Sequence, residues 1–139
     1  MSNSANDWNQ RVIEEFRANG GKVAAFDGRA LLLLHHKGAK TGTERVNPLV
    51  YQPVGDSFAV FASKAAAPTN PDWYHNLRAN PDATVELGNE TVEVRARVAE
   101  GDERDRIWEQ QKRDNPAFAD YELQTSRQIP VVVLERVAS

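Results

Sequence analysis

The sequence contains no cysteine, and its longest run of apolar residues covers only residues 30–34. Without cysteine the chain has no disulfides, thiolate metal sites, iron–sulfur clusters or cysteine nucleophiles. The apolar run is far shorter than the roughly 20 residues that a membrane span needs. Residues 1–10 are polar and lack the apolar segment of a signal peptide. We therefore expect a cytoplasmic protein, with weak association with a membrane surface left open.

The length and the net charge of the chain limit the number of domains and the kind of partner. The 139 residues suit one domain spanning 1–139, in which we expect residues 1–6 to be flexible. The chain has 17 Lys and Arg against 20 Asp and Glu, a formal net charge of −3. This mild acidity argues against nucleic acid as the main partner.

The apolar pattern alternates between short extended segments and a few helices. Helical spacing of apolar residues predicts a helix over 7–19, and further helices are expected over 72–79 and 102–113. Extended segments are predicted over 30–36, 45–54, 57–63, 83–87, 91–99 and 129–137, several of them joined by hairpin turns. Six short strands with peripheral helices predict an α+β domain built on a small β-barrel.

Several common motifs are missing. The sequence has no Gly-x-Gly-x-x-Gly fingerprint of a dinucleotide site and no Gly-x-Ser-x-Gly nucleophile elbow. His35 and His36 are adjacent in a predicted strand and point to opposite faces, and His75 stands alone on a predicted helix. The three histidines therefore do not predict a metal site.

Two stretches remain as candidate ligand sites. Residues 36–45 concentrate cations, glycines and threonines between two strands, and Lys40 and Arg45 supply charge for an anion. Residues 62–71 connect a strand to a helix through small residues, which allow a flat ligand to approach closely. From these residues alone, a solvated hairpin turn and an ordinary connection explain the two stretches as well.

Three separated segments, in this order, resemble the family of deazaflavin (F420)-dependent nitroreductases, which includes a mycobacterial enzyme that activates nitroimidazole prodrugs. The segments are GAKTGTERVNPL at 38–49, ASKAAAPTNPDWYHNLRANP at 62–81 and PAFADYELQTSRQIPVVV at 116–133. The resemblance implies a split β-barrel of the FMN-binding/pyridoxamine-oxidase type with about six antiparallel strands. It also implies coenzyme F420, an 8-hydroxy-5-deazaflavin with a phosphodiester and a polyglutamate tail.

The resemblance also assigns roles to residues. Lys40 and Arg45 would hold the phosphate or the glutamate tail, and Thr41 and Gly42 would shape the loop around them. Asn47, Pro48 and Leu49 would line the deazaflavin. The ring and its linker would be bordered by Phe61, Ala62, Ser63, Lys64, Ala67, Pro71, Trp73, Tyr74 and Asn76. Ser63 and Tyr121 are the candidate catalytic residues, and the candidate substrate contacts are Asn115, Phe118 and Tyr121.

The expected function is an F420-dependent reductase that transfers a hydride to an electron-poor small molecule such as a quinone, an enone or a nitro-aromatic. Two alternatives stay open: an F420 carrier without committed catalysis, and an FMN-binding reductase of the same fold. The nitroimidazole-activating relative has three tyrosines where this chain has Asn115, Phe118 and Tyr121. Prodrug activation is therefore not carried over. The sequence also leaves open whether the protein is a monomer or a homodimer.

Overall fold

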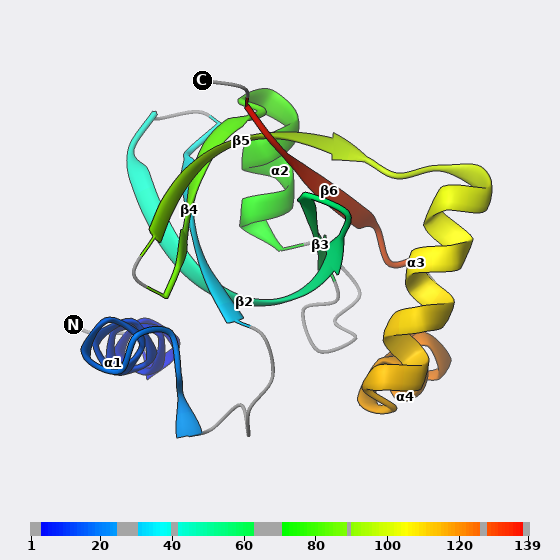
Figure 1. The fold of residues 1–139 in the computed structure, drawn as a ribbon, viewed down its shortest axis with the longest axis horizontal. Helices are drawn as coiled ribbons and strands as arrows, with labels where there is room; N and C mark the ends of the chain where they lie inside the picture. The colour runs from blue at the N-terminus through cyan, green and yellow to red at the C-terminus, as the bar shows by residue number, and fades with distance from the viewer. Residues whose placement is uncertain are drawn as a thin grey trace.

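The computed structural model shows a six-stranded barrel of antiparallel strands that closes in the order β1-β2-β3-β6-β5-β4 (Figure 1). It describes residues 4–24, 31–39, 42–62, 71–88, 90–125 and 128–137, with side chains from residue 9 onward. The strands are β1 (Leu31–Lys37), β2 (Glu44–Val54), β3 (Ser57–Phe61), β4 (Asp82–Leu87), β5 (Glu90–Val98) and β6 (Val131–Arg136). The helices are α1 (Ser4–Ala18), α2 (Asp72–Ala79), α3 (Gly101–Asp114) and α4 (Ala117–Gln124). The split-barrel expectation is confirmed.

The barrel interior is filled by alternate residues of all six strands, because successive side chains of a strand point to opposite faces. On β1, Leu32 and Leu34 point inward, whereas Leu31 and Leu33 point outward under α1. Trp73 and Leu77 of α2 join the interior cluster. Figure 1 shows α2 across the barrel, with α1 and the α3–α4 pair on opposite sides.

A second apolar layer lies outside the barrel, under α3 and α4. Phe61 of β3 and Val133 of β6 point into it and meet Trp108 of α3 and Phe118 of α4. The rings of Phe61 and Phe118 are in edge contact, with their centroids 5.4 Å apart. This aromatic layer attaches the two C-terminal helices to the barrel.

Strand β2 explains how two prolines fit in a closed barrel. Its first half, 44–50, pairs with β1, and its second half, 51–54, pairs with β3. Pro48 and Pro53 therefore each face a paired strand on one side only, which is where a sheet tolerates a residue without an N–H.

The helix α4 is absent from the sequence-based prediction. Its apolar positions are few, and the proline at 116 hides its start, because Pro116 serves as its N-cap in a helical conformation. The last strand begins at Val131, two residues later than expected, since Pro130 precedes it. Within the described ranges, no helix is long and apolar enough to cross a membrane.

Candidate functional site

The turn between β1 and β2 is closed by its own backbone. The Gly38 N–H donates to the Thr43 carbonyl over 2.9 Å, and the Gly42 N–H donates to the Gly38 carbonyl over 2.9 Å. Gly42 adopts φ +70°, which a side chain would strain, and a Cβ added there would meet open space. Lys40 and Thr41 lie outside the described residues.

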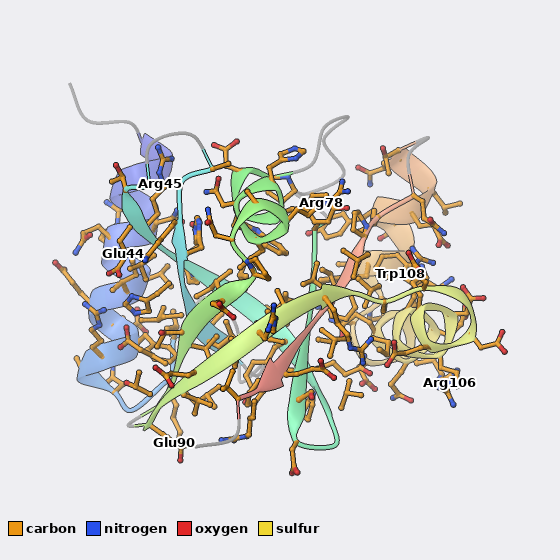
Figure 2. All side chains as sticks on the ribbon, turned by 90° about the horizontal axis from the view of Figure 1, so that it is seen from above. Glu44, Arg45, Arg78, Glu90, Arg106 and Trp108 are labelled. Atoms are coloured by element: carbon orange, nitrogen blue, oxygen red, sulfur yellow. The ribbon has the colours of Figure 1, made fainter. Side chains whose placement is uncertain are left out.

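This turn carries cations that the described part of the protein leaves without acid partners. Arg45 and Lys37 are exposed, and neither forms an ion pair with an acid of the described ranges. By contrast, Arg97 is held by Glu103 and Glu135, at 2.6 and 3.1 Å. Figure 2 shows Arg45 at the end of the barrel where α2 lies, and Glu90 at the opposite end. The turn therefore presents charge that an external anion can neutralise.

A buried chain of polar side chains ties this turn to α2 and β2. His36 Nε2 lies 2.7 Å from Asn47 Oδ1, and the other ring nitrogen, Nδ1, lies 3.0 Å from Asn76 Nδ2. Asn76 Oδ1 in turn accepts a 2.9 Å hydrogen bond from the backbone N–H of Ala39. Burial lowers the pKa of His36, an effect that the hydrogen bond to Asn47 opposes and the nearby charge of Arg45 reinforces.

Asn47 and Asn76 are predicted site residues, whereas His36, the residue that joins them, is not predicted from the sequence. His36 is only 3% exposed and lies on the same face of β1 as Leu32 and Leu34. The strand pattern, which placed His35 and His36 on opposite faces, already implied that one of them points into the barrel. A buried histidine needs hydrogen-bond partners on both nitrogens, and the two asparagines supply them.

The other predicted cofactor residues lie along β2, at the end of β3 and on α2. Leu49 packs against the interior cluster that contains Ala62, Trp73 and Tyr74. Pro71 is buried and is the N-cap of α2, and Pro48 is half-buried on β2. Ser63, Lys64 and Ala67 lie outside the described residues. The structure thus brings most described members of the predicted set from β2, β3 and α2 to one region of the barrel, with two exceptions. The first is Pro48, which pairs with Leu33 and therefore lies on the outer face of β2, under α1.

The second exception is Phe61, whose side chain points into the aromatic layer. Its ring centroid is 6.0 Å from that of Trp108 and 5.4 Å from that of Phe118. The next residue, Ala62, faces the barrel interior because the strand alternates. A contact between Phe61 and a cofactor would therefore involve its backbone.

Asn115, one of the three predicted substrate contacts, lines a cavity beside the second half of β2. The cavity has a volume of about 260 Å³, and its wall includes Tyr51, Gln52 and Gln111. Gln52 Nε2 donates to the Ile107 carbonyl at 3.0 Å and to Gln111 Oε1 at 3.3 Å. Asn115 is 5% exposed, and its buried Oδ1 has no hydrogen-bond partner among the residues that the structure describes. An unpaired buried acceptor is costly, so a turn of the Asn115 amide that exposed this oxygen to a donor in the cavity would be favourable.

Phe118 and Tyr121 lie on α4, one turn apart. Their ring centroids are separated by 5.4 Å, and Phe118 is buried in the aromatic layer. Tyr121 is half-buried against the same layer. Neither residue is on the wall of the Asn115 cavity.

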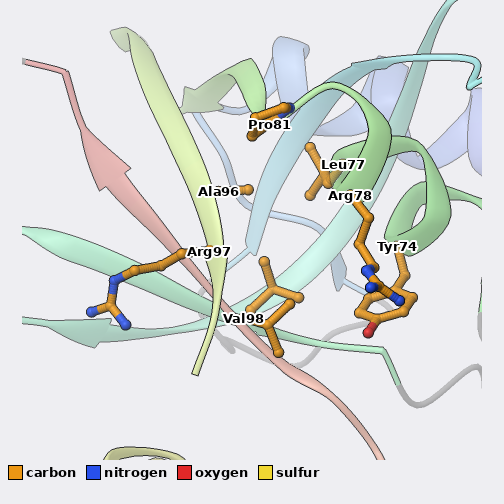
Figure 3. Close-up of a pocket in the computed structure, with 8 residues that line it drawn as sticks. Tyr74, Leu77, Arg78, Pro81, Ala96, Arg97 and Val98 are labelled. Carbon is orange, nitrogen blue, oxygen red and sulfur yellow. The ribbon is translucent and has the colours of Figure 1, made fainter. Parts of the chain in front are cut away.

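A further cavity lies between α2, β5 and β6 (Figure 3). Its volume is about 290 Å³, and its wall is mostly apolar, with Leu77, Ala96 and Val98 among its residues. Tyr74 lines it, and the Arg78 guanidinium lies 5.8 Å from the centre of the Tyr74 ring. Tyr74 therefore faces this cavity as well as the barrel interior.

Comparisons with known proteins agree with this architecture. A family model for F420H(2)-dependent quinone reductases matches residues 8–136. An F420H(2)-dependent quinone reductase of Mycobacterium tuberculosis is 42% identical over 108 residues, covering 76% of this chain and 72% of that protein. The solved structure of an F420-H2 dependent reductase is 36% identical with a TM-score of 0.71, covering 77% of this chain and 95% of that one.

More distant structures share the fold alone. A candidate pyridoxamine 5'-phosphate oxidase of Listeria innocua is 13% identical with a TM-score of 0.56, covering 83% of this chain and 90% of that one. The expectations of a pyridoxamine-oxidase-like barrel, of an oxidoreductase and of coenzyme F420 are confirmed at the level of the family. The matched residues span almost the whole chain, and this protein belongs to the family of F420H(2)-dependent quinone reductases.

Proposed function

We propose that the protein uses reduced F420 to reduce quinones, with the cofactor's anionic tail at the β1–β2 turn and the acceptor beside Asn115. The observation that carries the proposal for the acceptor is the buried Asn115 Oδ1, which has no hydrogen-bond partner within the described part of the chain. The relatives' names supply the acceptor class, because they are quinone reductases. When bound, the reduced deazaflavin supplies the hydride.

The β1–β2 turn fits the tail of such a cofactor. A phosphodiester with a glutamate tail carries several negative charges, and Arg45 and Lys37 are exposed cations without an acid partner among the described residues. Lys40 would add a third cation. The single phosphate of FMN would use less of this charge, so the turn favours F420 over FMN.

Strand β2 connects the two parts of the proposed site. Arg45 lies at the start of the strand, next to the turn, and Tyr51 and Gln52 farther along it line the Asn115 cavity. Six residues of extended strand separate Arg45 from Tyr51, a span of about 20 Å. An elongated cofactor lying along this strand would have its charged tail at one end and its ring towards the cavity.

The chemistry of Asn115 suits the product of the reaction. A quinone carbonyl is only an acceptor, but its reduction creates a hydroxyl, which donates a hydrogen bond. The Asn115 Oδ1, once its amide turns towards the cavity, can accept that bond, so the site gains an interaction as the acceptor is reduced. The side chain's Nδ2 can donate to the quinone carbonyl before reduction.

Phe118, Tyr121 and Ser63 stay proposed contacts of the acceptor, with Phe118 and Tyr121 placed on α4 outside the wall of the Asn115 cavity. Phe118 would provide an apolar wall, and the Tyr121 hydroxyl would position the acceptor or give it a proton. Ser63 would hydrogen-bond the acceptor or the cofactor. We also propose that the protein works in the cytoplasm and leave open whether it is a monomer or a homodimer.

Oxidation of reduced F420 by menadione, followed by absorbance, tests the proposal. For Asn115→Ala we expect kcat/KM for menadione to fall about fivefold to tenfold, the equivalent of one lost hydrogen bond at a buried site. The affinity for F420, measured by fluorescence quenching, should stay the same. Gln124→Ala is the matched control, because it truncates an exposed side-chain amide on α4.

Two outcomes would contradict the proposal. If the wild-type protein binds F420 but accelerates no acceptor of a broad quinone panel, it is a cofactor carrier. If it binds FMN tightly and F420 not at all, the turn has been assigned to the wrong ligand. An unchanged kcat/KM in Asn115→Ala would move the acceptor away from this cavity.

A further inference from the structure

The hydrogen-bonded chain from Ala39 to Asn47 has a direction that one of its members fixes. The backbone N–H of Ala39 can only donate, so the Asn76 atom that faces it must be the carbonyl oxygen, Oδ1. The Asn76 Nδ2 group must then face His36 Nδ1, which can only accept. The remaining ring nitrogen, Nε2, therefore carries the proton and donates it to Asn47 Oδ1.

The same polarity orients the side chain of Asn47. Since its oxygen faces His36, its Nδ2 group does not bond to the histidine and keeps its donors for another partner. One tautomer of His36 thus fixes the orientation of two side-chain amides. The Asn76 amide holds the Ala39 N–H of the cationic turn, and the Asn47 amide accepts the Nε2 proton with its oxygen.

We propose that His36 is a positioning residue for the cofactor site, which holds the β1–β2 turn only while its ring is neutral with the proton on Nε2. This inference rests on the proposed role of the turn in binding the F420 tail. His36 itself contacts the side-chain amides of Asn47 and Asn76, so its effect on binding is exerted through Asn47 and, by way of Asn76, through Ala39.

Protonation would break the chain at a defined point. A second proton on the ring must go to Nδ1, where it would face the Asn76 Nδ2 donors at 3.0 Å. If the Asn76 amide turns over to present its oxygen to the ring, it presents its Nδ2 group to the Ala39 N–H. Either arrangement sets two donors against each other, so one added proton releases the turn.

Charged groups from several elements surround His36 and set the pH at which this happens. Burial lowers the pKa of His36 from its ordinary 6.5, and the charge of Arg45, opposite His36 in the β1–β2 pairing, lowers it further. The hydrogen bond to Asn47 and the charge of Asp72 on α2 act in the other direction. His36 also lines a cavity of about 540 Å³. The other titratable and charged residues on the wall of this cavity are His35, Lys37, Glu44, Asp82 and Glu93. We therefore expect His36 to take up its second proton, and the turn to be released, below pH 6.5.

Nitrogen-15 NMR of the histidine rings in the cofactor-free protein is the first test, and it needs no variant. We expect His36 to show the Nε2–H tautomer at neutral pH and to titrate below 6.5, with the Ala39 amide signal moving in step. A charged ring or the Nδ1–H tautomer at neutral pH would overturn the proposal. An Ala39 amide signal that stays unchanged while His36 titrates would also overturn the proposal.

The second test measures F420 affinity by fluorescence from neutral pH down to about pH 5, the range in which histidines titrate. The wild-type protein should bind about fivefold more weakly at the acid end, the equivalent of one hydrogen bond. His36→Gln keeps a donor and an acceptor but cannot be protonated, so its affinity should lack this extra acid dependence. His75→Gln, which removes an exposed histidine of α2, should behave like the wild type.

The outcomes separate this inference from the proposed function. The cofactor's own titration is common to all three proteins, so only the difference between them reports on His36. If the F420 affinity of the wild type and of His36→Gln depends on pH in the same way, the proposed role of His36 is wrong. Tighter wild-type binding in acid would show that His36 acts through its charge, which also overturns it. If no form binds F420 at neutral pH, the proposed function fails, and the NMR result still decides the state of His36.

Discussion

Two buried regions of this barrel are built on opposite principles. At the polar end, His36, Asn47 and Asn76 are joined by hydrogen bonds and hold the backbone of a cationic turn. In the aromatic layer, the rings of Phe61, Trp108 and Phe118 pack at centroid distances of 5.4 to 6.0 Å. Both regions depend on the alternation of strand residues, which sends His36 to one face of β1 and Phe61 to the outer face of β3.

The aromatic layer contributes mainly to the stability of the fold, whereas the polar end contributes mainly to cofactor binding. Burying apolar rings removes large areas from water, which is the main favourable contribution to folding. Burying amides and a histidine gains little net free energy, because each hydrogen bond replaces one made to water. The polar end therefore serves chiefly to fix orientation, and changes there should affect the cofactor more than the free energy of unfolding.

The largest expected effect comes from Trp108→Ala. Trp108 is 1% exposed, and its removal should lower the free energy of unfolding by about 3–5 kcal/mol. Denaturant unfolding measures the loss, with Leu123→Ala as the control on the neighbouring helix, since Leu123 is 85% exposed. The F420 affinity of the folded fraction should stay within about twofold. A small stability loss with a large loss of affinity would reverse the proposed division between the two regions.

A smaller effect, of the opposite kind, is expected for Arg45→Ala. F420 should bind about tenfold more weakly at low salt, and the difference should shrink as salt is added, because the interaction is Coulombic. The free energy of unfolding should change by less than about 0.5 kcal/mol. Fluorescence quenching measures the affinity, and Arg106→Ala removes the same charge from an exposed position of α3.

If Arg45→Ala and Arg106→Ala weaken binding equally, only the net charge matters, and the turn is not the site of the tail. Unchanged affinity in both variants at low salt would lead to the same conclusion.

The sequence predicted the barrel and the location of the cationic turn well, for physical reasons that can be named. Alternation in residues 91–99 and the turn residues at 55–56 define antiparallel hairpins, which the structure contains as β4–β5 and β2–β3. The glycines of the turn were visible as well, and Gly42 does adopt a left-handed conformation.

The parts of the site that depend on long-range contacts could not be predicted in the same way. His36 and Asn76 are 40 positions apart, and their hydrogen bond exists only because α2 packs across the strands. Likewise, Asn115 was singled out by resemblance, but its unpaired oxygen and the cavity shared with β2 follow from how α3 docks on the barrel. A helix as weakly amphipathic as α4 gives little periodic signal.

The smallest expected effect concerns Glu86, which contacts His35 and so distinguishes this histidine from its neighbour His36 on β1. His35 faces outward and contacts Glu86 of β4, which also accepts a 2.7 Å hydrogen bond from Arg17 of α1. That bond lowers the pKa of Glu86 from its ordinary 4.5. Because the folded pKa is depressed, the pair stabilises the protein above about pH 4.5 and loses this contribution as the pH falls through the lower, folded pKa.

Glu86→Gln should therefore cost about 0.5–1 kcal/mol of unfolding free energy at neutral pH, a modest value because Arg17 is half-exposed. Chemical denaturation at several pH values should show the difference from the wild type shrinking below about pH 4.5. The acid dependence of F420 binding should be unaffected, since it belongs to the inward-facing His36. If Glu86→Gln removes that dependence as well, the two faces of β1 are coupled, and the polar end is part of a larger charged network that includes α1.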